Sequence, residues 1–103
     1  MSSPRFESFI FDDENEEKIT YHGLSARRVI QVLDNIHLVI PNRKRRKGQY
    51  LIIGRDNGGK CIVVPVESTR VPELWRPITA WQCKKGEETL LNKHRGFYGK
   101  QEK

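Results

Sequence analysis

Long hydrophobic runs are missing from this sequence of 103 residues. The longest, Cys61 to Val66, has six residues, whereas a helix that spans a bilayer needs about 20 apolar residues. The segment Met1 to Pro4 lacks the basic and then apolar pattern of a secretory leader. The sequence therefore predicts neither a membrane span nor a signal peptide, and we expect a cytoplasmic protein.

Cysteine is scarce, with Cys61 and Cys83 the only two in the chain. They are far apart and each lies in a strand-like run, which excludes the CxxC spacing of a metal or redox site. We expect both as small, buried core residues in a reducing compartment rather than as a disulfide. Neither forms a ligand cluster with His37 or His94, so the sequence predicts no metal and no cofactor.

Acidic residues are fewer than basic ones, 13 against 19, which gives a formal net charge of +6. Residues 1–20 hold two basic and six acidic side chains, whereas residues 21–103 hold seventeen and seven. The cationic part favours a polyanionic partner, either nucleic acid or an acidic protein, although solubility alone also explains such a charge. The length and the apolar content of 36% predict one domain over residues 1–91 and a flexible basic tail over residues 92–103.

Two short helices are predicted near the N-terminus. Asp12-Asp13 offers an N-cap, with Glu16 three residues after Asp13 in the capping-box position, and Gly23 suits the left-handed residue after the helix. Ser25 is the candidate N-cap of the second helix. The apolar positions of that helix repeat with the period of a buried face: Ala26, Val29, Ile30, Leu33 and Ile36. We expect both helices to pack on one face of a sheet, with His22 at their joint.

Residues 50–82 read as an antiparallel sheet of three runs that are separated by turn residues. Pro65, inside the second run, lacks an amide donor and favours an edge position or a bulge. Strands are also expected at residues 6–11 and 37–40, and a short helix at residues 84–91. Together these elements predict an α+β fold, an antiparallel sheet with two N-terminal helices packed on one face and a short C-terminal helix.

A block of consecutive basic residues follows the strand expected at residues 37–40: Arg43, Lys44, Arg45, Arg46 and Lys47. Such a block must lie in solvent because like charges repel one another. Two interpretations are about equally weighted, a solubilising loop and a contact to a nucleic-acid backbone that releases counterions. We include these five residues, together with Trp81, among the candidate RNA contacts.

Three short segments resemble the BrnT family of bacterial type II toxins, which have a RelE-like fold. Tyr21-His22-Gly23-Leu24-Ser25 resembles the Lys-His-Gly-Val-Ser of the family, and Gly54-Arg55 closes a strand as its Gly-Arg does. Arg76-Pro-Ile-Thr-Ala80 resembles its Arg-Ile-Ile-Ser-Ala. The likeness spans most of residues 6–91. It implies a RelE-like fold and a ribonuclease that blocks translation, held silent by a cognate antitoxin protein.

RNA cleavage by the neighbouring 2′-hydroxyl needs a group that accepts the hydroxyl proton, a group that protonates the leaving 5′-oxygen, and cations around the phosphorus. Histidine suits this proton transfer, and His22 is followed by a structurally important glycine. Arg55 and Arg76 can each bind a phosphate with two hydrogen bonds, and Tyr21 can donate a hydrogen bond or stack on a base. We name these four as candidate catalytic residues and expect His22 and Arg76 in one site.

Each candidate also has a structural interpretation. The histidine can cap a helix C-terminus. Arg55 can pair with Glu67 or Glu73, and Arg76 can stack on Trp75. The sequence also departs from the family, with tyrosine in place of lysine before the histidine and tryptophan in place of arginine after Ala80. A non-catalytic RNA- or DNA-binding module, or a domain that binds an acidic protein, therefore stays open.

Overall fold

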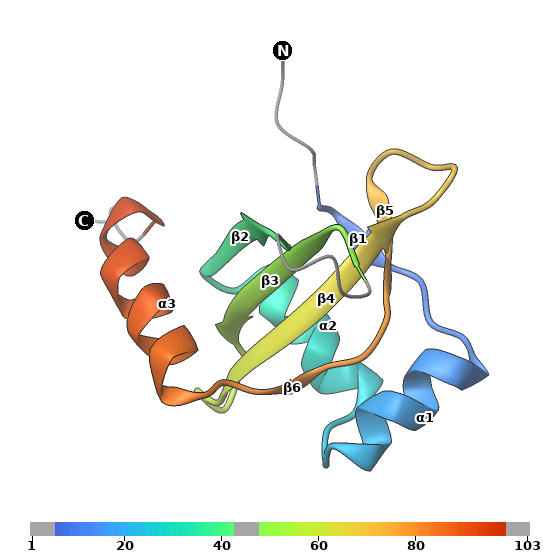
Figure 1. Ribbon diagram of the computed structural model, residues 1–103, viewed down its shortest axis with the longest axis horizontal. Coiled ribbons are helices and arrows are strands. Elements are labelled where there is room, and N and C mark those ends of the chain that lie inside the picture. The colour runs from blue at the N-terminus through green and yellow to red at the C-terminus, as the bar shows by residue number, and fades with distance from the viewer. Residues whose placement is uncertain (1–5, 43–47, 99–103) are drawn as a thin grey trace.

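The computed structural model describes residues 6–42 and 48–98. They form the predicted α+β fold, with three helices and a six-stranded, mostly antiparallel sheet (Figure 1). In chain order the elements are β1 (Ser8–Phe9), α1 (Asp13–Tyr21), α2 (Ala26–Asp34), β2 (His37–Pro41), β3 (Tyr50–Arg55), β4 (Cys61–Ser68), β5 (Leu74–Pro77), β6 (Trp81–Gln82) and α3 (Lys85–Tyr98).

The sheet has the strand order β1-β5-β4-β3-β2, and the short β6 also pairs with β4. Only β1 and β5 pair in parallel. β4 is the central strand, and its first residues pair with β6 while its last residues pair with β5. Pro65 lies between these two partners and not at an edge of the sheet, so its missing amide donor falls where the neighbouring strand changes.

One face of the sheet is covered by α2, which lies behind the strands in Figure 1. Val29 and Val32 of α2 join a buried apolar cluster with the sheet, and Ile19 of α1 reaches the same cluster. The expected apolar stripe of α2 is partly wrong. Ile30 is 44% exposed and Ile36 is 41% exposed, because the buried side of the helix passes through Val32 instead.

The opposite face is covered only in part by α3, which lies to one side of the sheet in Figure 1. Leu91 is the buried contact of α3 and packs with Leu38 of β2, Ile53 of β3 and Val63 of β4. The helix continues to Tyr98 instead of ending near Leu91, so part of the predicted flexible tail is helical. Beyond this cluster on the same face, Ile40 and Leu51 are partly buried and Pro65 is buried.

The first helix is anchored to the sheet by an asparagine. Asp12, one of the two expected residues, is its N-cap, and Asn15 replaces Glu16 as the partner in the capping box. The buried Asn15 amide also donates to the carbonyl of Pro77 at 2.9 Å. This bond joins the first turn of α1 to the end of β5. Ser25 is the N-cap of α2, as predicted.

Cys61 and Cys83 form a disulfide, so the expectation of two separate core cysteines was wrong. The antiparallel pairing of β6 with the start of β4 continues one step further, where the amide of Cys83 donates to the carbonyl of Cys61 at 2.9 Å. This pairing brings the two Cα atoms to 5.2 Å, within the usual disulfide range. The disulfide therefore joins the first residue of β4 to the short segment between β6 and α3.

Candidate functional site

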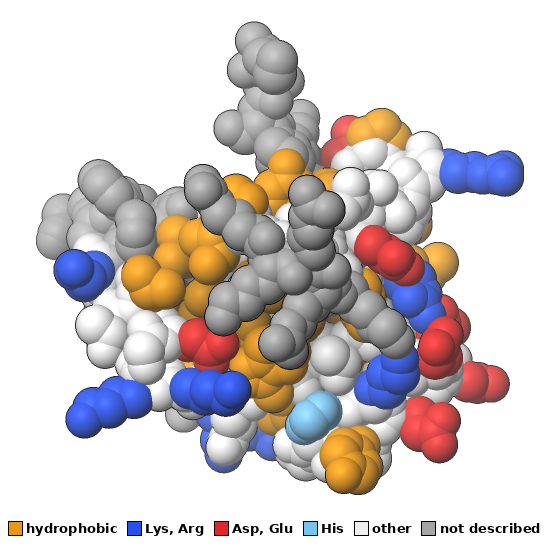
Figure 2. All heavy atoms as spheres, viewed as in Figure 1, with side chains coloured by type: hydrophobic (Ala, Val, Ile, Leu, Met, Phe, Trp, Pro, Cys, Tyr) orange, Lys and Arg blue, Asp and Glu red, His pale blue; other side chains and the backbone are white. Residues whose placement is uncertain are grey.

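A groove of about 920 Å³ lies on the open part of the sheet face that α3 leaves uncovered. Figure 2 shows hydrophobic side chains on this face beside α3 and toward the end of α1. The groove is lined by side chains from α1, β2, β3, β4 and the segment that leads into α3: Lys18, Tyr21, His22, Ile40, Pro41, Asn42, Leu51, Pro65, Ile78, Thr79, Trp81, Lys84 and Glu87.

The floor of the groove is a row of apolar residues that runs across the strands. Ile40 pairs with Leu51, and Leu51 pairs with Pro65. The carbonyl of Pro65 accepts a hydrogen bond from Ile78 at 2.9 Å, which extends the row. The adjacent row on the same face is the one that Leu91 covers, so the groove continues one apolar surface beyond the part that α3 covers.

One wall comes from the end of α1. His22 is the C-cap residue of this helix, and Gly23 follows with a φ of 80°, the left-handed conformation that glycine adopts readily. Tyr21 projects into solvent with 84% of its surface exposed, and its ring meets the His22 ring edge-on at 5.3 Å between centroids. The C-terminal end of α1 thus places an imidazole and an exposed phenol side by side at the groove.

The other wall is formed by β6 and the first turn of α3. The indole N–H of Trp81 donates to the carboxylate of Glu87 at 3.3 Å, and the same carboxylate accepts the Lys84 amide at 2.8 Å. Glu87 therefore joins β6 to the start of α3. Cys83 lies between Trp81 and Lys84 in sequence, and its disulfide bond to Cys61 fixes this wall to β4.

The groove carries basic groups and few carboxylates. Lys18 pairs with Glu14, four residues earlier on α1, at 3.6 Å. Within residues 6–42 and 48–93, the side chains of His22 and Lys84 make no ion pair. Aromatic side chains of this kind can stack on flat rings, and lysine side chains can contact anionic groups such as phosphates.

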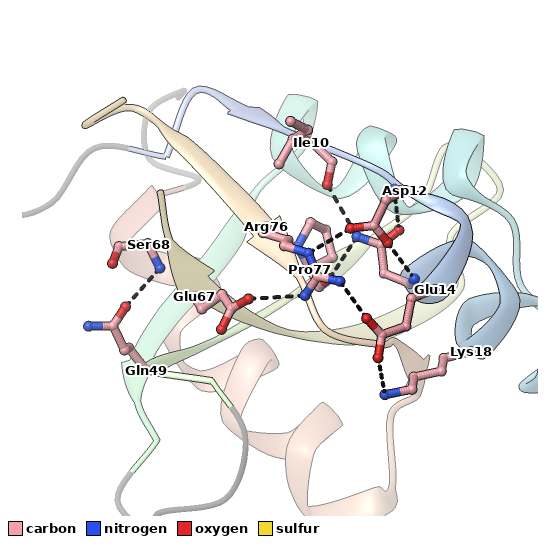
Figure 3. A network of polar contacts seen from close by, with 10 residues as sticks. Ile10, Asp12, Glu14, Lys18, Gln49, Glu67, Ser68, Arg76 and Pro77 are labelled. Carbon is pink, nitrogen blue, oxygen red and sulfur yellow. Dashed lines mark hydrogen bonds and ion pairs between the residues drawn. The ribbon is translucent and has the colours of Figure 1, made fainter. Parts of the chain in front are cut away.

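Arg76 lies outside the groove, and its guanidinium is held by three carboxylates (Figure 3). The Nε–Oδ2 distance to Asp12 is 2.7 Å, the Nη1–Oε2 distance to Glu67 is 3.0 Å and the Nη2–Oε1 distance to Glu14 is 3.1 Å. The hydrogen bond from Arg76 is the main reason that the pKa of Asp12 lies below its ordinary value of 3.8. The same bond raises the pKa of Arg76.

This arrangement assigns a structural role to Arg76. Each nitrogen of the guanidinium already has an anionic partner, so a phosphate would have to displace a carboxylate. The pairs join α1 and its N-cap to β4 and β5. The expected stacking on Trp75 is replaced by these ion pairs, because Trp75 belongs to the cluster on the face that α2 covers.

Arg55 is also held by protein groups. Its Nη2 lies 3.0 Å from the Glu88 carboxylate and 3.1 Å from the Asn92 side-chain oxygen, and its Nη1 donates to the Gly59 carbonyl at 2.8 Å. The partner is therefore on α3 and is neither Glu67 nor Glu73. Arg55 lines a smaller cavity of about 410 Å³, away from the groove.

The structure thus brings three of the sequence-predicted residues together, Tyr21, His22 and Trp81, and it does not bring Arg55 or Arg76 to them. The basic block lies outside the described residues. The residues that flank it are close to each other, since the Asn42 side-chain amide donates to the Gly48 carbonyl at 3.2 Å. Asn42 itself lines the groove.

Sequence reasoning missed Lys18, Lys84 and Thr79. Lys18 lies three and four residues before Tyr21 and His22, so helical spacing alone places it on their side of α1. Lys84 and Thr79 reach the groove because the segment between β5 and α3 crosses the sheet face. No local sequence pattern indicates that path.

Within the described part of the chain, no cluster of three metal-ligating side chains is found, and no helix is both long and apolar enough to span a bilayer. A comparison with protein-family models found no matching family, and a comparison with curated proteins found no matching protein.

Proposed function

We propose that this protein is an endoribonuclease that binds single-stranded RNA in the groove and cuts it with His22, without a metal ion. The observation that carries the proposal is that His22 stands beside an exposed tyrosine in an apolar groove that also holds Lys18, Trp81 and Lys84. Histidine can exchange a proton near neutral pH. The aromatic side chains can stack on bases, and the lysines can contact phosphates.

The chemistry requires one proton to move. The 2′-hydroxyl of a bound nucleotide attacks the adjacent phosphorus and loses its proton to the imidazole of His22. The bond to the 5′-oxygen then breaks, and the imidazolium returns the proton to that oxygen. The products are a 2′,3′-cyclic phosphate and a free 5′-hydroxyl. Lys18 is the cation nearest to His22 in sequence that can stabilise the extra negative charge at phosphorus.

We further propose that the cellular role is that of a toxin in a type II toxin–antitoxin pair, which rests on the resemblance to BrnT toxins. The cognate antitoxin would silence the protein by covering the groove. Charge complementarity favours an acidic segment of that partner, because its carboxylates would face Lys18 and Lys84.

The test is a cleavage assay on an end-labelled, unstructured RNA, with and without ribosomes. His22→Gln should lower the cleavage rate by about 10²-fold or more, the usual effect of a lost acid–base group. The matched control is His37→Gln, because His37 lies on β2, outside the groove, and its ring nitrogen contacts the Asn35 carbonyl at 2.8 Å. Equal cleavage by both variants would contradict the assignment of His22.

A second candidate function is a non-catalytic RNA-binding module. It is favoured by the carboxylate partners of Arg76 and Arg55, since no arginine is found among the described residues that line the groove. Wild-type protein that binds the RNA but does not cut it, with ribosomes present or absent, would select this function.

A further inference from the structure

The buried side-chain hydroxyl of Thr79 is the feature that the proposed function does not account for. Among the side-chain atoms of the described residues, Thr79 Oγ1 is the one buried nitrogen or oxygen atom without a hydrogen-bond partner. A buried hydroxyl without a partner lowers stability, and native proteins contain few of them. Thr79 also lines the groove. A polar group kept at a cost to stability within a binding groove is a candidate contact for the ligand.

The surroundings of Thr79 restrict what that ligand can be. The neighbouring groove residues on the sheet are apolar: Ile40, Leu51, Pro65 and Ile78. The described residues of this floor offer a phosphate no cation in exchange for its lost hydration, whereas the flat face of a base can pack there. The lysines lie at the two walls, on α1 and just before α3. A base on the floor and phosphates at the walls match this distribution.

We propose that Thr79 is a specificity-determining residue whose hydroxyl hydrogen-bonds the edge of an unpaired RNA base seated in the groove. This proposal rests on the RNA binding proposed above. Oγ1 is covered in the free protein, so the hydroxyl must turn toward the base when it binds. A rotation of about 120° about χ1, to another staggered rotamer, moves the hydroxyl to the position of the methyl group and the methyl group to the position of the β-hydrogen. Paired bases are stacked inside a duplex, so the groove selects single strands.

The decisive variant is Thr79→Val, which keeps the shape of the side chain and removes the hydroxyl. Its melting temperature should equal or exceed that of the wild type, because an unsatisfied polar group is lost. Its affinity for an unstructured RNA should fall by about tenfold, the effect of one lost hydrogen bond to a base edge. Thr79→Ser should restore the affinity. Stability and affinity therefore change in opposite directions, which a purely structural role of Thr79 does not produce.

The matched control is Thr89→Val, because Thr89 is an exposed residue of α3 outside the groove and its hydroxyl donates to the Lys85 carbonyl at 2.9 Å. This variant should bind RNA as the wild type does. A second control replaces the bases of the RNA, one position at a time, by abasic sites. At the position that occupies the groove, Thr79→Val should cause no further loss of affinity.

Two results would overturn the proposal while leaving the proposed function intact. One is wild-type affinity of Thr79→Val for every RNA tested. The other is a marked fall in its melting temperature, which would mean that the hydroxyl has a partner within the protein. A wild-type protein that binds no RNA would overturn the proposal together with the proposed function.

Discussion

Two neighbouring regions of the same sheet face differ in the groups that surround their basic side chains. At the edge of the groove, Glu67 on β4 pairs with Arg76 on β5, and the guanidinium is surrounded by carboxylates. Two residues earlier on β4, Pro65 belongs to the groove floor. There the basic side chains stand beside apolar and aromatic groups, and His22 has no carboxylate partner among the described residues.

The difference shows that residue type alone does not identify a phosphate-binding site. An arginine next to a tryptophan in a basic sheet satisfies the sequence criteria for such a site, yet the acidic residues of α1 and its N-cap fold back onto Arg76. The acidic N-terminal segment thus neutralises one part of the basic sheet. In the groove next to it, His22 and Lys84 make no ion pair with the residues whose side chains are described, whereas Lys18 shares Glu14 with Arg76.

The largest effect is expected from breaking the disulfide, because it supports the groove wall but not the Arg76 cluster. Reduction should lower the free energy of unfolding by about 3 kcal/mol, since the bond closes a loop with a sequence separation of 22. Amide hydrogen exchange should become faster in α3, where Leu91 is the buried anchor, and stay unchanged in α1. Denaturant titration and exchange mass spectrometry measure the two quantities.

The control is the variant Cys61→Ala/Cys83→Ala, which should be less stable than the oxidised wild type and should not respond to the reductant. Equal exchange rates in α3 of oxidised and reduced wild-type protein would show that the disulfide does not hold the groove wall.

A smaller effect is expected from Arg76→Gln. The melting temperature should fall by about 4 °C, because a network of partly exposed ion pairs stabilises a domain only modestly. RNA affinity should not change. The pKa of Asp12 is lower in the folded protein than its ordinary value of 3.8, so this stabilisation is present above that pH and is lost as the pH falls through the lowered pKa. The difference in melting temperature between the wild type and the variant should therefore become smaller in acid.

Thermal unfolding from pH 7 down to pH 2 measures this difference. A constant difference over the whole range would contradict the role of Asp12, and a large loss of RNA affinity in Arg76→Gln would move the binding site to the carboxylate cluster. The matched variant is Lys84→Gln in the groove, which should reduce RNA affinity with little change in melting temperature.

Local sequence patterns predicted the elements that depend on nearby residues. The N-cap at Ser25, the turn at Gly23 and the antiparallel strands of residues 50–82 follow from short-range chemistry. The joint that carries His22 was predicted in the same way. The fold class was predictable because the strand-like and helical segments are well separated along the chain.

Long-range pairings were not predictable in this way. Cys61 and Cys83 form a disulfide because β6 pairs with β4. Arg55 forms an ion pair with Glu88 because α3 returns across the sheet. Both depend on the path of the chain after β5. The same path decides that one apolar row of the sheet is covered while the next one forms the groove.

The central claim is that RNA binds in the groove and not at the Arg76 cluster. The most direct measurement is ultraviolet cross-linking of the wild-type protein to an unstructured RNA, followed by mass spectrometry of the cross-linked peptides. Aromatic side chains that stack on bases are well placed to cross-link. We expect the cross-links at Tyr21 and Trp81. Cross-links confined to the segments around Asp12, Glu67 and Arg76 would contradict the account.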